Sequence, residues 1–284
     1  MGAMAAQTQH EDGFWWSKDG LRLHYRDYAG RTDRPPILCI PGLTRNARDF
    51  AHVAERLAGE WRLICVDLRG RGESGYSKLP MSYGPLTYLQ DIEDLLETLQ
   101  LGRFVCFGTS LGGLMTMMLA AHSTGRIAGA LLNDIGPVIE EAGLERIRGH
   151  VGKSASWPSW MHAARATENI LAAAHPDYEI AQWISLSKRL NRLTAQGRIV
   201  PDYDMRIAEP MRHPAEAVDL WPALDALRDV DFLIQQPFGF AERVADHFAR
   251  RAGDHRNRLR ALLEHLARAA VDRDHFVKIG FVEE

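Results

Sequence analysis

Residues 104–113 read FVCFGTSLGG, and they carry the strongest indication of the fold. Its apolar start predicts a buried strand, and a Gly-x-Ser-x-Gly turn leads from there into a helix predicted over residues 111–121. The turn is so short that Ser110 must take a positive φ, and Gly108 and Gly112 make room for it. Such a turn lifts the serine hydroxyl above the sheet edge, at a helix N-terminus whose dipole favours developing negative charge.

Short apolar runs recur along the chain, with stretches of helical spacing between them. The runs are residues 37–40, 63–66, 104–107 and 130–133, and the helical stretches are 50–58, 86–99 and 111–121. Continuous apolar runs are typical of parallel strands that are covered on both faces. Residues 14–28 read as a hairpin that turns at Asp19-Gly20. The alternation predicts an α/β fold with a mostly parallel sheet flanked by helices.

Residues 137–220 lack this strand pattern and are rich in aromatic residues. They are predicted to form a helical cap inserted into an α/β core, which would comprise residues 13–136 and 221–284. A helix over 219–227 and a strand over 232–234 would return the chain to the sheet. The only later strand candidate is 276–282.

The composition is that of an ordinary globular protein. The 284 residues are 46% hydrophobic and 25% charged, and the net charge of −3 argues against a nucleic-acid partner. No apolar run approaches the roughly 18 residues of a membrane span, and the start does not resemble a signal peptide, so we expect a cytoplasmic protein. The oligomeric state stays open.

The three cysteines, Cys39, Cys65 and Cys106, lie inside the apolar runs and have no metal-like spacing. We expect them to be buried strand residues without a chemical role. No metal or organic cofactor is implied, and the expected partner is a small-molecule substrate.

From about residue 14 to 227 the chain resembles the α/β-hydrolase superfamily. It is most similar to lid-bearing members such as enol-lactonases, carboxylesterases and carbon–carbon bond hydrolases. Besides the serine turn, the strand and turn ILCIPGL (37–43) resemble the place of the first oxyanion-hole amide. The resemblance implies that the amides of Leu43 and Leu111 hold the oxyanion. Family members often have His-Gly where this chain has Pro41-Gly42.

Two further motifs support the resemblance. VDLRGRGES (66–74) is similar to the family's Asp-x-Arg-Gly-x-Gly-x-Ser loop, which implies that Asp67 and Arg69 are structural and brace the oxyanion turn. LLNDIGP (131–137) lies where some relatives have their catalytic acid. Asp134 is therefore either that acid or a residue that caps the loop.

A serine nucleophile needs a histidine to take its proton and an acid to orient that histidine. The family order is Ser, acid, His, yet after Ser110 the only Gly-His pair lies in the predicted cap, at 149–150. His275 resembles the family motif most, although it precedes its strand instead of following it. Glu242 and Asp246 lie near the expected place of the acid, and each also fits a solvated helix residue.

Two functional hypotheses follow. The first is a serine hydrolase that acts on a small ester, lactone or activated C–C substrate through an acyl-enzyme. The alternative is a catalytically impaired ligand-binding protein with the same fold but without the triad histidine. The unusual C-terminal segment is either a rebuilt tail or the product of a reading-frame shift near Asp231. Translating the other two frames past that codon would test for a shift.

Overall fold

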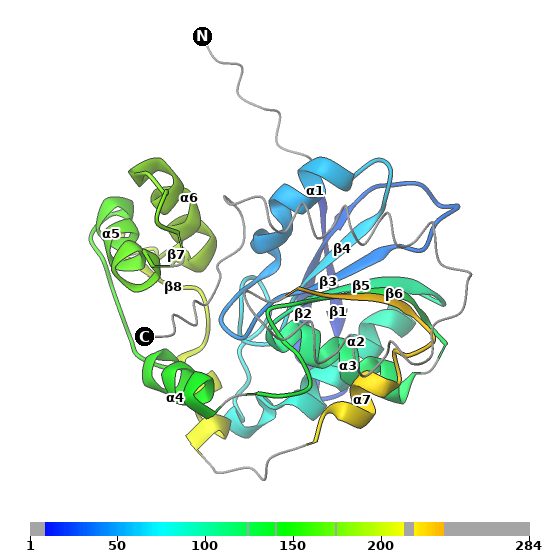
Figure 1. The fold of residues 1–284 in the computed structure, drawn as a ribbon. Helices are drawn as coiled ribbons and strands as arrows, with labels where there is room; N and C mark the ends of the chain where they lie inside the picture. Colours follow the sequence, from blue (N-terminus) through cyan, green and yellow to red (C-terminus); the bar gives the residue numbers. More distant parts are fainter. Residues whose placement is uncertain (1–8, 124, 140, 174, 213–218, 236–284) are drawn as a thin grey trace.

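The computed structural model describes residues 9–123, 125–139, 141–173, 175–212 and 219–235. Seven strands form one sheet in the order β1-β2-β4-β3-β5-β6-β9 (Figure 1). They are β1 (Glu11–Trp16), β2 (Arg22–Tyr28), β3 (Ile37–Ile40), β4 (Leu63–Asp67), β5 (Phe104–Thr109), β6 (Ile127–Asn133) and β9 (Asp231–Gln235). The β1–β2 and β2–β4 pairs are antiparallel, and all other neighbours are parallel. The predicted α/β fold with a mostly parallel sheet is confirmed.

Helices cover both faces of the sheet. They are α1 (Ala51–Leu57), α2 (Pro85–Thr98), α3 (Leu111–His122) and α7 (Trp221–Asp225). Figure 1 shows α1 on one face and α2, α3 and α7 on the other. Each helix lies close to a stretch for which the sequence predicted one, because its apolar stripe is long enough to show helical spacing.

Alternate strand residues point to opposite faces and enter different cores. On β3, Leu38 and Ile40 pack with the α2 and α3 side, whereas Ile37 and Cys39 pack against α1. All three cysteines are buried and unpaired, as the apolar runs predicted. The middle strands therefore bury both faces, which explains why they appear in the sequence as continuous apolar runs.

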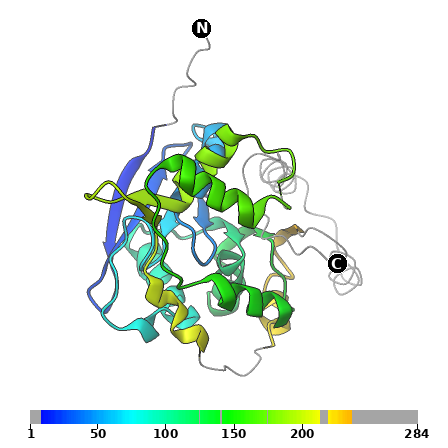
Figure 2. The ribbon, with the colours of Figure 1, turned by 90° about the vertical axis from the view of Figure 1, so that its left-hand side faces the viewer.

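Residues 137–220, called the insert below, connect β6 to α7. Its helices are α4 (Glu141–His150), α5 (Trp160–Leu171) and α6 (Ile180–Leu190). In Figure 2 these helices lie in front of the sheet. The insert begins shortly after the C-terminal end of β6. An isolated bridge between Arg71 and Tyr203 joins the insert to the loop after β4. The insert therefore lies at the edge where the parallel strands end.

The insert is not purely helical, which corrects the prediction of a helical segment without strands. A short antiparallel hairpin, β7 (Asn191–Leu193) and β8 (Ile199–Pro201), follows α6. Gly197 takes a φ of 73° in the turn between them. Strands of three residues are too short to display the alternation by which a strand is recognised in a sequence.

Candidate active site

Ser110 lies in the turn between β5 and α3. Its φ of 51° and ψ of −115° are strained values for a residue with a side chain. The Ser110 N–H donates a hydrogen bond of 2.8 Å to the carbonyl oxygen of Asn133, at the end of β6. The positive φ expected from the sequence is thus present, and the neighbouring strand holds the turn in place.

The two glycines of the turn are required by close backbone contacts. A Cβ atom on Gly108 would lie 2.3 Å from the carbonyl oxygen of Gly112. A Cβ atom on Gly112 would lie 1.9 Å from the carbonyl oxygen of Ile40. These separations are shorter than any ordinary contact, so the turn tolerates no side chain at either position.

Two backbone amides lie beside Ser110. Leu111 is the first residue of α3, so its N–H has no partner within the helix. Leu43 follows Gly42, and a Cβ atom on Gly42 would lie 3.7 Å from the Cβ atom of Ser110. Within the described residues, neither the Leu43 nor the Leu111 N–H donates a hydrogen bond. The arrangement leaves two donors available next to the serine.

Arg71 fixes the turn that carries Leu43. Its Nε donates a hydrogen bond of 2.7 Å to the carbonyl oxygen of Leu43. Its Nη1 donates to the carbonyl oxygen of Arg69 at 2.6 Å and to the hydroxyl of Tyr88 at 2.9 Å. The side chain is fully buried. No role for Arg71 could be predicted, because nothing in a glycine-rich loop indicates which distant carbonyl an arginine reaches.

Asp67 braces the same region from the end of β4. Its carboxylate accepts hydrogen bonds from the backbone N–H groups of Ala47, at 2.6 Å, and Glu73, at 3.0 Å. The Nδ1 of buried His24 lies 2.7 Å from Asp67 Oδ2, and its Nε2 lies 2.9 Å from Asp12 Oδ1. Asp67 thus links β2 to the segments that hold Ala47 and Glu73, which agrees with the structural role expected for it.

The charge of His24 follows from these contacts. Burial disfavours the protonated ring, but the hydrogen bonds and the charges of Asp67 and Asp12 outweigh burial and raise the pKa of His24. With a carboxylate at each ring nitrogen, the imidazolium form is the one that the structure stabilises. This contact could not be predicted from the sequence, because Asp67 and Asp12 belong to different strands.

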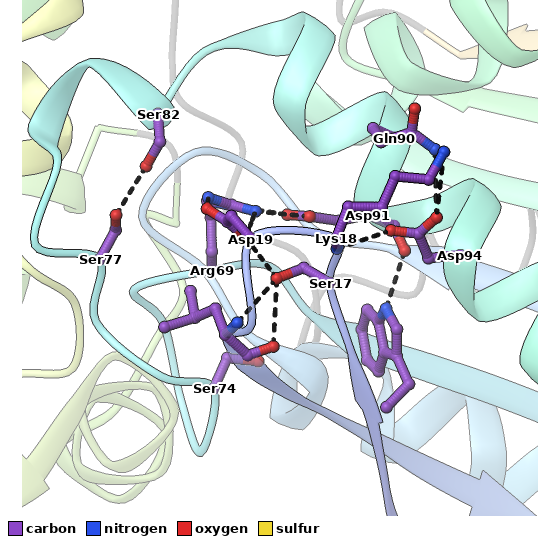
Figure 3. A network of polar contacts seen from close by, with 12 residues as sticks. Ser17, Lys18, Asp19, Arg69, Ser74, Ser77, Ser82, Gln90, Asp91 and Asp94 are labelled. Carbon is purple, nitrogen blue, oxygen red and sulfur yellow. Dashed lines mark hydrogen bonds and ion pairs between the residues drawn. The ribbon is translucent and has the colours of Figure 1, made fainter.

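Arg69 is a second structural residue of the loop. It lies between Asp91 of α2 and Asp19 of the β1–β2 turn (Figure 3). Both of its bonds to the Asp91 carboxylate are 2.6 Å long, and both side chains are buried. The pair anchors the loop after β4 to α2, a contact that the sequence did not predict.

Of the candidate partners of Ser110, only Asp134 lies within the described residues. Asp134 directly follows the residue whose carbonyl binds the Ser110 N–H, and its φ is 58°. It therefore lies next to the serine turn, in a conformation that is uncommon for an aspartate. His275, Glu242, Asp246 and the strand expected at 276–282 lie outside the described residues.

Two further properties concern the described residues as a whole. They contain no group of three or more His, Cys, Asp or Glu side chains that could hold a metal ion. No helix among them is both long enough and apolar enough to span a lipid bilayer.

Ser110 thus lies in a strained turn between a parallel strand and a helix, beside two backbone N–H groups that donate no hydrogen bond within the described residues. A family model described as the alpha/beta hydrolase fold matches residues 35–226, and the chain belongs to this family. It is similar to the crystal structure of an alpha/beta hydrolase from Novosphingobium aromaticivorans, with 53% identity, a TM-score of 0.77 and 81% of each chain covered.

Curated relatives agree with this assignment. The 3-hydroxybutyrate-oligomer hydrolase of Cupriavidus necator is 28% identical over 242 residues, which cover 81% of this chain and 82% of that protein. The 2-(acetamidomethylene)succinate hydrolase of Mesorhizobium japonicum is 29% identical over 143 residues, 50% of each chain. The chain is therefore an enzyme with the α/β hydrolase fold.

Proposed function

We propose that the enzyme is a serine hydrolase that cleaves a small ester, lactone or activated C–C substrate through an acyl-enzyme on Ser110. The observation that carries this proposal is the strained φ of Ser110 together with the free N–H groups of Leu43 and Leu111 beside it. Residues held in strained backbone conformations by their surroundings cluster at functional sites. The 3-hydroxybutyrate oligomers named for one relative are joined by ester bonds, which favours an ester substrate.

In this reaction the Ser110 Oγ attacks the carbonyl carbon while a histidine accepts its proton. The Leu43 and Leu111 amides donate to the oxyanion that forms, and each such donor contributes about 100- to 1000-fold to the rate of a hydrolase. The C–O bond to the alcohol then breaks, and the histidine returns the proton to the alcohol oxygen. Water attacks the resulting acyl-enzyme and releases the acid product.

The proton acceptor and the orienting acid come from the sequence candidates. We assign the histidine to His275 and the acid to Asp134 or Glu242. Asp134 is favoured by its position after the residue that binds the Ser110 N–H. The insert would act as the cap, because its Tyr203 pairs with Arg71, the residue that binds the Leu43 carbonyl oxygen.

Burst kinetics with p-nitrophenyl acetate test the proposal. We expect a burst of one p-nitrophenol per protein molecule from the parent protein and none from Ser110→Ala at the same concentration. His275→Ala should abolish the burst if it is the proton acceptor. Absence of a burst from the folded parent protein would contradict the serine mechanism and favour a protein that binds ligands without turning them over.

A further inference from the structure

Two arginines meet one carboxylate where the insert touches the loop after β3. Arg45 belongs to that loop and forms a bidentate ion pair with Asp49, with Nη2 2.6 Å from Oδ1. Arg189 lies near the end of α6 in the insert, and its Nε is 4.0 Å from Asp49 Oδ1. That distance is too long for a hydrogen bond, so Asp49 is hydrogen-bonded to Arg45 and not to Arg189.

Arg189 is a buried cation whose only ion pair within the described residues is the 4.0 Å contact with Asp49. Its side chain is only 9% exposed, and its Nε has no hydrogen-bond partner in this part of the chain. Its Nη1 lies 3.2 Å from His52 Nε2, which must be unprotonated to accept the bond. Burial, opposed by a Glu55 hydrogen bond, lowers the pKa of His52 and keeps the ring neutral. A buried charge is costly unless an anion pairs with it.

The cluster lies close to the serine. A Cβ atom added to Gly42 would lie 3.4 Å from the Cγ atom of Arg45 and 3.7 Å from the Cβ atom of Ser110. Arg45 and Ser110 thus flank one glycine of the oxyanion turn. The stem of Arg45 thereby connects the cluster to the turn beside Ser110.

We propose that Arg45 and Arg189 form a subsite for a carboxylate on the substrate, so that the enzyme prefers esters carrying a free acid group. Guanidinium groups bind carboxylates through paired, charge-assisted hydrogen bonds. The Nε of Arg189 supplies an unused donor, and the two guanidinium groups share the single buried carboxylate of Asp49. This inference rests on the proposed serine hydrolysis, because it names the substrate class of that same site.

The test compares 4-nitrophenyl hydrogen glutarate with 4-nitrophenyl methyl glutarate, two esters that differ only in whether the far carboxyl is free. We expect the parent protein to favour the free acid by about tenfold or more in kcat/KM, the size of a charge-assisted pair. Arg189→Gln should bring this ratio close to one, and Arg189→Lys should leave it in between. Arg165→Gln, which removes an exposed arginine of the insert paired with Glu168, should leave the ratio as in the parent.

A ratio near one in the parent, or a ratio unchanged in Arg189→Gln, would overturn the subsite. Calorimetric binding of monomethyl glutarate to Ser110→Ala separates this outcome from failure of the serine mechanism. If neither ester is turned over but Ser110→Ala binds the monoester and loses it with Arg189→Gln, the subsite stands and the serine mechanism fails. If there is neither turnover nor binding, both are wrong.

Discussion

The guanidinium of Arg71 donates from Nε to the carbonyl oxygen of Leu43, 2.7 Å away and 28 positions earlier in the chain. Arg71 forms no ion pair with any described residue, and its charge is instead held by two carbonyls and by the rings of Tyr83 and Tyr88. A buried arginine without a carboxylate is costly to keep. We infer that Arg71 is retained because it holds the turn that carries the Leu43 N–H beside the serine.

Replacing Arg71 should therefore reduce catalysis more than binding. In Arg71→Met the Leu43 carbonyl loses a hydrogen bond to a charged donor, a contact worth about 1.5–3 kcal/mol. We expect kcat to fall by about 10- to 100-fold while KM changes little, measured on the same ester with circular dichroism as a check on folding. An unchanged kcat in a folded Arg71→Met protein would contradict the positioning role.

Gly112→Ala should destabilise the protein, because its new Cβ atom would lie 1.9 Å from the Ile40 carbonyl oxygen. Moving α3 away from β3 costs about 1–3 kcal/mol in a packed core, and we expect at least that loss in urea unfolding. Gly149→Ala is the matched control, because Gly149 lies in α4 and a Cβ atom there meets nothing within 4 Å. Equal stabilities of the two variants would show that the turn is not as tight as described.

The pair of Arg69 and Asp91 should contribute strongly to stability. Asp91→Asn leaves a buried guanidinium with one carboxylate fewer, and breaking a buried ion pair costs about 3–5 kcal/mol. The exposed pair of Arg31 and Asp33 provides the control, since solvent screens it, and Asp33→Asn should leave the unfolding midpoint unchanged. Chemical denaturation of both variants measures the difference, and a loss in Asp91→Asn no larger than in the control would contradict the prediction.

His24 should make stability depend on pH. Its pKa is raised in the folded protein, so its contribution is complete below the unfolded value near 6.5 and is lost as pH rises through the raised value. We expect the gap in unfolding free energy between the parent and His24→Gln to shrink as pH rises from about 6 to about 9. A gap that stays constant or widens over this range would mean that the folded ring is neutral.

The parts of the site that depend on neighbours in sequence could be predicted, and those that depend on distant contacts could not. The strained turn at Ser110 follows from its two flanking glycines, which are adjacent along the chain. Arg71, Arg189 and His24 could not be assigned, because their partners lie in other elements of the structure. The β7–β8 hairpin was missed because its strands are too short to show a pattern.

Active-site labelling with a fluorophosphonate, followed by peptide mapping by mass spectrometry, tests directly whether Ser110 is an activated nucleophile. We predict a single adduct on Ser110 in the parent protein and none in Ser110→Ala under the same conditions. The strained turn and the free amides of Leu43 and Leu111 would then belong to an activated nucleophile. A folded parent protein that remains unlabelled, or that is labelled at another residue, would contradict the proposed role of Ser110 as the nucleophile.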